Sequence, residues 1–413
     1  MDKTSNKIEE KYLEQAQKLG RDCEILPGGV EELAAKLQKS AKTGKPLKIK
    51  LGMDPSRPDL HLGHTVVMRK IREFQKLGHT LQLLVGGATA MIGDPSGKSE
   101  TRPALTKEQV DENAKTYFEQ ISRVIDVEAA NVLNNADWLH KMTLPDIINL
   151  SSKVTVAQIM TREDFNARFK EGRPIAIHEF FYPLMQAYDS VVLDCDIELG
   201  GTDQRFNTLL GREMQTAYGK EEPQIVMLLP LLEGTDGVKK MSKSYPEHCI
   251  GICDKPTDMY GKLMSIPDEL IVRYYSLLTD LSNEEIEDVK RRLVSSNPRD
   301  LKMKLAHLIT EMYCGKDEAD KAEAEFVNVV QNKGIPTDIP EIKLEADIPL
   351  SEIILNNKLV ESKGELKRLI AQGGVKIDDA KCTDINEIIK ITDLPKVLKV
   401  GKRKFLRITN ESK

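Results

Sequence analysis

The sequence predicts an α/β protein with a parallel sheet, because a strand, a helix and a second strand follow one another along the chain. Residues 47–51 alternate between apolar and basic side chains, as in a strand, and Gly52 closes this segment. Apolar residues then recur at helical spacing from 62 to 77, and residues 81–85 form a second strand. This order implies two parallel strands joined by a right-handed crossover. Residues 225–232 add a fully buried strand.

Length and composition fit a globular protein of several domains. The 413 residues suggest two or three domains, and 40% hydrophobic residues are enough for a core, which excludes wholesale disorder. No apolar run approaches the ~18 residues of a membrane helix. The first seven residues lack the apolar stretch of a signal peptide. We therefore expect a cytoplasmic protein that does not enter a membrane.

The cysteines predict neither a disulfide framework nor a metal site. Six of them are spread along the chain, which is too sparse for a set of disulfides. His248, Cys249 and Cys253 lie close together, but a four-residue spacing without a second pair is weak evidence for metal ligation. The preferred interpretation is that these cysteines are small apolar residues beside a strand, and no protein-bound metal is predicted.

Changes in the sequence pattern divide the chain into three domains and a linker. The α/β pattern fills residues 1–255, and helical periodicity without strands follows at 256–333. A polar, proline-rich linker is expected at 334–346. The last domain, 347–413, combines a helix at 362–371 with short strands. It has 14 basic and 10 acidic residues on an otherwise acidic chain, an asymmetry that is compatible with nucleic-acid binding.

The first motif with chemical content is His61-Leu62-Gly63-His64, where a loop opens a helix. The backbone N–H groups of a helix N-terminus favour a bound phosphate. Gly63 has no side chain, so a flat base or a ribose can press against the backbone. Two histidines three residues apart share one face of the helix. Taken alone, such a pair is more often a surface or core feature than a functional one.

The second motif is the loop segment Lys240-Met241-Ser242-Lys243-Ser244, with glycines shortly before it. Small, polar and basic residues of this kind are typical of a mobile loop that closes over an anion. Lysines in such a loop act as movable point charges that neutralise developing negative charge. Charged loops are common, so this segment too is weak evidence by itself.

Together the two motifs resemble the HIGH and KMSKS signatures of the class I aminoacyl-tRNA synthetases. The resemblance implies a Rossmann-like catalytic domain that binds ATP, with Mg²⁺ accompanying the ATP. His61 and His64 would steady the phosphate oxygens in the transition state, and Lys240 and Lys243 would hold the departing pyrophosphate. An amino-acid carboxylate is already a nucleophile at pH 7, so positioning and charge stabilisation suffice, without a general base.

Further segments resemble bacterial tyrosyl-tRNA synthetases, in the second of two bacterial subtypes. They are residues 86–98, 182–189 and 201–204, and the similarity extends from about residue 30 to 411. The resemblance implies an enzyme that joins tyrosine to tRNA(Tyr) through tyrosyl-adenylate, and that acts as a homodimer. It places Asp54, Asp94, Tyr182, Gln186, Asp189 and Gln204 at the tyrosine, and Gly63, Lys98, Arg102, Asp203, Lys240, Lys243 and Ser244 at the ATP.

Within these sets the resemblance gives some residues specific roles. Asp94, Tyr182 and Gln186 would hold the tyrosine ammonium, and Asp203 would bind the ribose. Asp189 would accept a hydrogen bond from the phenol hydroxyl, and a carboxylate that needs this partner rejects phenylalanine. The alternative is that 182–189 is one polar helix face, although its apolar neighbours favour a pocket.

Three alternatives remain open from the sequence. In the other subtype a tyrosine on the first strand also contacts the substrate hydroxyl, but Lys50 stands here, so the second hydroxyl partner is open. A tryptophanyl-tRNA synthetase is close in fold, although Asp189 and the appended C-terminal domain argue against it. A non-catalytic RNA-binding protein descended from a synthetase would have little reason to keep both histidines and both loop lysines.

The C-terminal segment 348–409 resembles an S4 RNA-binding domain. The helical domain before it would help to grip the anticodon arm of the tRNA. Basic side chains of this kind suit phosphate contacts, which position RNA without reading its bases. The residues expected to contact RNA are Lys363, Lys367, Arg368, Lys402, Arg403 and Lys404.

Overall fold

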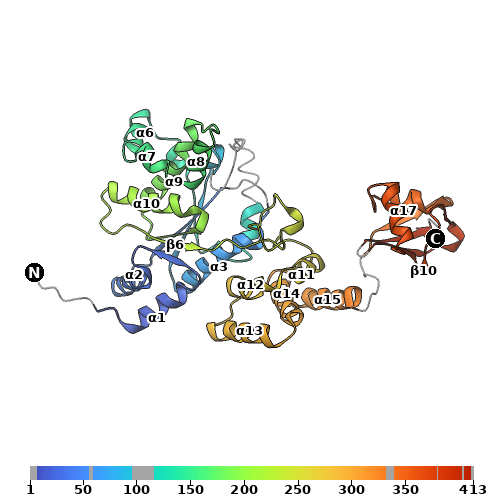
Figure 1. Ribbon diagram of the computed structural model, residues 1–413. Helices are drawn as coiled ribbons and strands as arrows, with labels where there is room; N and C mark the ends of the chain where they lie inside the picture. The colour runs from blue at the N-terminus through green and yellow to red at the C-terminus, as the bar shows by residue number, and fades with distance from the viewer. Residues whose placement is uncertain are drawn as a thin grey trace, which may run out of the picture. The chain divides into compact units, whose positions relative to one another are not determined.

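The computed structural model describes residues 7–54, 59–94, 116–331, 339–378, 380–401 and 404–410 (Figure 1). The chain divides into two compact units, Met1–Ala319 and Asp320–Lys413. Most of the helical region that follows the sheet therefore belongs to the same unit as the sheet. The separate domain boundaries at residues 255 and 333 stay predictions.

The first unit is built on a six-stranded sheet with the order β1-β6-β5-β2-β3-β4. All neighbouring strands run parallel except β1 and β6, which are antiparallel. The predicted α/β class with a parallel sheet is confirmed. The strands are β1 (Glu24–Leu26), β2 (Lys48–Met53), β3 (Thr80–Val85), β4 (Asn131–Asn134), β5 (Ile197–Gly201) and β6 (Ile225–Leu229).

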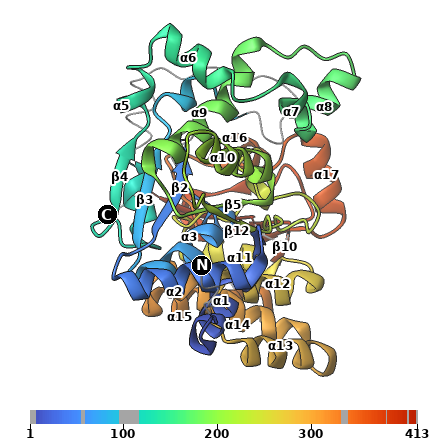
Figure 2. The same cartoon turned by 90° about the vertical axis from the view of Figure 1, so that its left-hand side faces the viewer.

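Two crossover helices lie on opposite faces of this sheet (Figure 2). α3 (Leu62–Lys76) joins β2 to β3, and α10 (Arg205–Ala217) joins β5 to β6. The chain moves from the middle of the sheet in opposite directions in these two crossovers, so right-handed connections place their helices on opposite faces. The point at which the order of connection reverses lies between the neighbouring strands β2 and β5. In open α/β sheets, ligands bind at the carboxyl ends of the strands at such a point.

Two strand limits differ from the sequence-based expectation. Gly52 lies inside β2 rather than at its end, because β2 stays in register with β3 as far as Met53 and Val85. β6 stops at Leu229, since Pro230 has no N–H to donate to a neighbouring strand.

Short loops and helices complete the first unit. Among the described residues, no helix is both long enough and apolar enough to cross a membrane. In the described residues, the α-helices other than the two crossovers are α1 (Glu10–Leu19), α2 (Gly29–Thr43), α5 (Ala136–Leu139), α6 (Leu144–Ser151), α7 (Val156–Ile159), α8 (Glu163–Lys170), α9 (Ile177–Leu193), α11 (Pro256–Met264), α12 (Ile271–Leu278), α13 (Asn283–Ser295), α14 (Pro298–Cys314) and α15 (Lys316–Phe326), which crosses the unit boundary.

The helical region α11–α14 is bound to α3 and to the loop that precedes the second motif. Asp280, just after α12, forms ion pairs with Arg69 and Arg72 of α3. Tyr274 of α12 is fully buried and donates its hydroxyl to the Glu233 carbonyl at 2.6 Å. Since α3 begins at the first motif and Glu233 lies before the second, these contacts fix both motifs to one helical scaffold.

The second unit contains a five-stranded sheet with the order β10-β9-β12-β13-β7, and a separate pair, β11 and β8. Its apolar core gathers residues such as Leu350, Leu366 and Leu398 from the helices and the sheet. The strands are β7 (Glu341–Leu344), β8 (Ile348–Pro349), β9 (Val375–Ile377), β10 (Ala380–Lys381), β11 (Ile388–Ile389), β12 (Lys396–Val400) and β13 (Lys404–Asn410), and the helices are α16 (Leu350–Asn356) and α17 (Lys363–Ala371).

The expected linker at 334–346 needs one correction. Its last part contains β7, which pairs in parallel with β13, and Leu344 of this strand is buried in the core of the second unit. The alternation of Ile342 and Leu344 with charged neighbours is a strand pattern that the proline-rich stretch before it obscured. Residues 332–338 lie outside the described part of the chain.

Candidate active site

A cavity of about 380 Å³ opens at the carboxyl ends of β2, β3 and β5, where the strand order predicts a ligand site. It brings together residues that are far apart in the sequence. Of the predicted site residues, those that line it are Asp54, His61, Gly63, His64, Asp94, Tyr182, Gln186, Asp189, Asp203, Gln204 and Lys240.

The two histidines of the first motif stack on each other at the start of α3. Their ring centroids are 3.8 Å apart, and Nδ1 of His64 accepts the backbone N–H of His61 at 3.2 Å. Burial and the neighbouring Lys243 lower the pKa of His64 to about 4, and burial and His64 lower that of His61 to about 2. Both rings are therefore neutral at pH 7. Because Nδ1 of His64 accepts, its proton lies on Nε2.

The His61 ring lies next to the space above Gly63. A Cβ atom there would come within 3.0 Å of the His61 ring and 3.7 Å of the Met241 Cβ. The missing side chain therefore makes room for the His61 ring, and Gly63 itself lines the cavity.

The second motif forms a hairpin that reaches the first one. Met241 donates its N–H to the Leu232 carbonyl at 2.7 Å, and Lys240 forms a bridge with Glu233. The Lys240 ammonium then forms an ion pair with Asp203 at 3.0 Å. Lys243 does not line the cavity, but its ammonium lies 3.4 Å from the Asp59 carboxylate, just before His61.

A hydrogen-bonded set of side chains crosses one wall of the cavity. The Tyr182 hydroxyl donates to Asp54 at 2.7 Å, and burial and Asp54 raise the Tyr182 pKa well above its usual value, so the hydroxyl keeps its proton. On the neighbouring wall, Asp94 accepts from the Gln204 amide at 2.9 Å and pairs with Arg162 at 3.4 Å. These carboxylates, close to one another, suit a bound cation such as an ammonium group.

Asp189 is the most enclosed carboxylate of the predicted set, with 2% of its surface exposed. It accepts the Trp138 indole N–H at 2.8 Å and the Asn135 amide at 3.1 Å, one on each oxygen. Burial raises the pKa of Asp189 to about 7, although Lys50 and both hydrogen bonds pull it down. The carboxylate keeps acceptor capacity for a donor in the cavity.

Sequence reasoning missed Asn135, Trp138 and Glu198. Asn135 and Trp138 follow β4, whose position beside β3 brings its carboxyl end to the same edge of the sheet. Glu198 pairs with Lys50 inside the core. A lone acid in the apolar strand Ile197–Gly201, together with Lys50 between the apolar residues Ile49 and Leu51 of β2, is the signal that could have revealed this pair.

The remaining predicted site residues either are exposed in the described part of the chain or fall outside it. Ser244 is exposed on the loop. Lys98, Arg102, Lys402 and Arg403 lie outside the described residues. In the second unit, Lys363, Lys367 and Arg368 are exposed on α17, and Lys404, at the start of β13, is exposed as well. The part of the chain that the structure describes contains no group of three or more metal-ligating side chains.

A family model described as tRNA synthetases class I (W and Y) matches residues 42–331. The chain belongs to this family. The synthetase is 50% identical over 407 residues to the tyrosine–tRNA ligase of Carboxydothermus hydrogenoformans, covering 95% of this chain and 98% of that protein. It is 53% identical over 381 residues to the tyrosine–tRNA ligase of Thermotoga maritima, covering 92% and 93%. The predicted family, enzyme class and function as a tyrosine–tRNA ligase are confirmed.

Solved structures share the fold of this synthetase. A tyrosyl-tRNA synthetase complexed with L-tyrosine from Archaeoglobus fulgidus matches with a TM-score of 0.60 and 21% identity, covering 76% of this chain and 99% of that one. A C-terminally truncated mitochondrial tyrosyl-tRNA synthetase of Aspergillus nidulans matches with a TM-score of 0.60 and 23% identity, covering 76% and 92%. At these identities the likeness concerns the fold.

Proposed function

We propose that the cavity binds tyrosine with its phenol hydroxyl at Asp189 and activates it with ATP. The observation that carries this proposal is the buried carboxylate itself. Asp189 is held by Trp138 and Asn135 and retains acceptor capacity toward the cavity. A site built around such an acceptor rejects an amino acid without a hydroxyl, because the carboxylate would stay unpaired. The ammonium group would lie near Asp94, Tyr182 and Gln186, with Asp54 and Gln204 beside it.

Activation would then be an in-line displacement. A carboxylate oxygen of tyrosine bonds to the α-phosphorus of ATP, the bond from that phosphorus to the bridging oxygen breaks, and pyrophosphate leaves with the electron pair. His61 and His64, as neutral rings, would donate hydrogen bonds to phosphate oxygens, and Lys240 and Lys243 would hold the departing pyrophosphate. Gly63 and Ser244 would contact the nucleotide. Lys98 and Arg102, which the structure does not describe, would contact it as well.

The ion pair between Lys240 and Asp203 suggests that the ribose of ATP binds before Lys240 reaches the phosphates. In the structure Asp203 neutralises Lys240 at 3.0 Å. A ribose that takes the Asp203 carboxylate as its acceptor would release the lysine toward the phosphates. Mg²⁺ would enter with ATP as the counter-ion of its phosphates.

The second half-reaction would use the second unit. We propose that Lys363, Lys367, Arg368 and Lys404, together with Lys402 and Arg403, contact phosphates of tRNA(Tyr). Three of these lie on the exposed side of α17, whose apolar side contributes the buried Leu366 to the core. Such contacts position the tRNA and weaken as salt concentration rises.

We further propose that the synthetase acts as a homodimer in the cytoplasm. Large apolar side chains are exposed on neighbouring helices α6, α7 and α8 and at the start of α9: Leu144 (69%), Ile148 (61%), Val156 (65%), Phe169 (70%) and Ile177 (77%). An exposed apolar group of this kind favours a protein partner. Ile148→Lys should lower the mass measured by light scattering to that of one chain, while Val294→Lys, at an exposed valine on α13, should not.

Charging of total bacterial tRNA tests the proposal. The full chain should attach labelled tyrosine, and not labelled tryptophan, to acid-precipitable tRNA in the presence of ATP and Mg²⁺. Charging with tryptophan would favour the alternative amino acid. Binding of tRNA without charging by either amino acid would favour a non-catalytic RNA-binding protein.

A further inference from the structure

A buried ion pair lies directly beneath the proposed tyrosine site. Lys50 of β2 and Glu198 of β5 are partners in the parallel register of these strands, and their Nζ and Oε1 atoms are 2.9 Å apart. Their side chains are 0% and 2% exposed. Removing one partner would leave a buried charge without compensation, so the two residues form one unit. Both also line the cavity.

The ammonium group of Lys50 has no donor left for a ligand. It bonds the Glu198 carboxylate, the Ser190 hydroxyl at 2.8 Å and the Gln186 carbonyl at 3.1 Å. An ammonium group has three N–H donors, and here each has an acceptor. Lys50 therefore acts on α9, where Gln186 and Ser190 lie on either side of Asp189.

On the basis of the proposed tyrosine activation, we propose that Lys50 is a positioning residue that determines specificity for the substrate hydroxyl. It holds residues 186–190 of α9 against the sheet, so that Asp189 and the Gln186 side chain face the cavity, and it places a positive charge near the Asp189 carboxylate. The Gln186 Oε1 atom is buried without a hydrogen-bond partner in the described chain, as expected for a group that waits for a ligand.

The charges around Asp189 agree with this role. Burial raises its pKa, and Lys50 is the strongest of the influences that lower it, ahead of the hydrogen bonds from Asn135 and Trp138. Glu198 raises the pKa, but less than Lys50 lowers it. Loss of the whole ion pair would therefore leave Asp189 protonated up to a higher pH. A protonated carboxyl group is a weaker acceptor for the hydroxyl.

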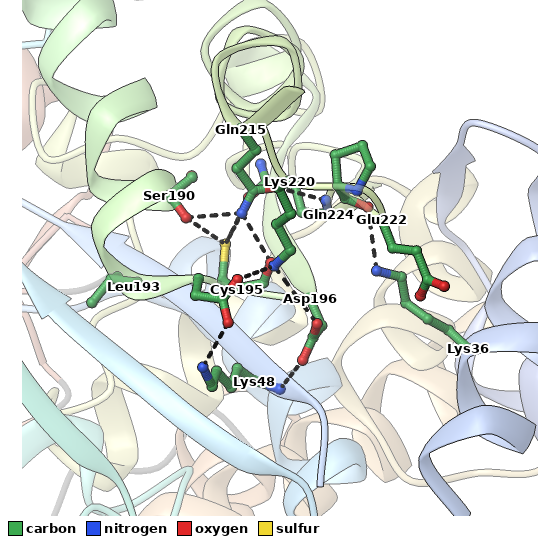
Figure 3. A network of polar contacts seen from close by, with 12 residues as sticks. Lys36, Lys48, Ser190, Leu193, Cys195, Asp196, Gln215, Lys220, Glu222 and Gln224 are labelled. Atoms are coloured by element: carbon green, nitrogen blue, oxygen red, sulfur yellow. Dashed lines mark hydrogen bonds and ion pairs between the residues drawn. The ribbon is translucent and has the colours of Figure 1, made fainter. Parts of the chain in front are cut away.

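The surroundings of the ion pair allow its charges to be removed together. Glu198 also accepts from Ser190 and from the Gln224 amide, so a neutral amide at position 198 keeps polar partners. Behind it, Gln215 donates to the Ser190 and Cys195 carbonyls and binds α10 to the end of α9 (Figure 3). These contacts do not involve Lys50 and should maintain the fold in its absence.

The test is the ratio of kcat/KM for tyrosine to that for phenylalanine in pyrophosphate exchange, from pH 6 to 9. This ratio cancels the titration of the amino group and isolates the hydroxyl. In the double variant K50M/E198Q it should fall by about 10-fold or more at pH 7, because a hydrogen bond to a charged group is weakened. The pH at which the ratio reaches half its maximum should rise, while kcat at saturating tyrosine changes little.

The matched control is K48M/D194N. Lys48 lies on the same strand, and its ion pair with Asp194 at 3.0 Å is exposed (Figure 3 shows Lys48 below Cys195). This control removes the same two charge types, two residues before Lys50 and four before Glu198, and it should leave both the ratio and its pH dependence unchanged. Circular dichroism and thermal unfolding establish that each variant is folded.

An unchanged ratio and pH dependence in folded K50M/E198Q would overturn the inference, provided that the unmodified chain exchanges with tyrosine. Failure of the unmodified chain would contradict the proposed function instead. If K50M/E198Q does not fold, Ser190→Ala decides the question. It removes one anchor of Lys50 on α9 without changing a charge, and the ratio should fall about threefold or more, whereas an unchanged ratio would contradict the role of Lys50.

Discussion

Trp138, the chain's only tryptophan, donates its indole N–H to Asp189 at 2.8 Å. The contact joins helices α5 and α9 through two residues that are 51 positions apart in the sequence. It orients the carboxylate on which the proposed recognition of tyrosine depends. It also places a natural fluorophore beside the substrate site, so tyrosine binding should change the protein's tryptophan emission.

Asp189→Asn should erode the discrimination between tyrosine and phenylalanine. The asparagine offers one acceptor instead of two, while Trp138 and Asn135 already require both. The hydroxyl thus loses its charged acceptor, and kcat/KM for tyrosine should fall by about 10- to 100-fold while that for phenylalanine changes little. Asp194→Asn, at the exposed end of the same helix, is the control. Retained selectivity at normal activity would show that Asp189 is not the hydroxyl partner.

The histidine pair should work without titrating between pH 6 and 9. Because burial lowers the pKa values of His61 and His64 to about 2 and about 4, both rings are neutral throughout this range. His61→Ala should reduce kcat for pyrophosphate exchange by about 100-fold, by the same factor at pH 6.5 and pH 8.5. The exposed His178 provides a matched alanine control. A loss that is much greater at pH 6.5 would indicate that a charged imidazolium is at work.

Lys243→Ala should slow tyrosine activation far more than it weakens tyrosine binding. Its charge matters most as pyrophosphate leaves, so we expect a loss of about 100-fold or more in kcat with little change in tyrosine affinity. Lys239→Ala is the control, because Lys239 lies on the same loop over the Tyr245 ring and outside the cavity wall. Equal exchange rates in the two variants would remove the Lys243 charge from the mechanism.

The motifs could be found from the sequence, whereas contacts across the sheet could not. His61 and Lys240 stand in short contiguous segments, and a helix N-terminus or a glycine-rich hairpin can be recognised from neighbouring residues. The pair Lys50–Glu198 depends on the register of β2 against β5, and the contact of Trp138 with Asp189 depends on where β4 joins the sheet. Neither register follows from local patterns, and a buried lysine contradicts the usual exposure of that residue type.

The same limit explains the errors at element ends. The alternating pattern of residues 47–51 predicts a strand that Gly52 closes, but pairing with β3 carries β2 past Gly52. β7 was hidden in the expected linker because its pairing with β13 joins residues more than sixty positions apart. In both places a long-range partner decides the structure, and the local sequence does not reveal that partner.

Removing the chain after residue 339 should separate the two half-reactions. The cut deletes the whole C-terminal sheet, from β7 to β13, whose core is formed by residues of that segment. All residues that line the cavity remain. We expect near-normal pyrophosphate exchange and strongly reduced charging of tRNA, most severely at high salt. Equal loss of both rates in a truncated chain that circular dichroism shows to be folded would contradict a separate RNA-binding module.

The most direct test of the account is amino-acid-dependent exchange of labelled pyrophosphate into ATP by the full chain. The assay needs no tRNA and is run in parallel with tyrosine, phenylalanine and tryptophan. If Asp189 receives the phenol hydroxyl in the cavity, tyrosine alone supports rapid exchange, and phenylalanine at the same concentration stays close to the rate without amino acid. Exchange that is equally fast with phenylalanine or faster with tryptophan would contradict it.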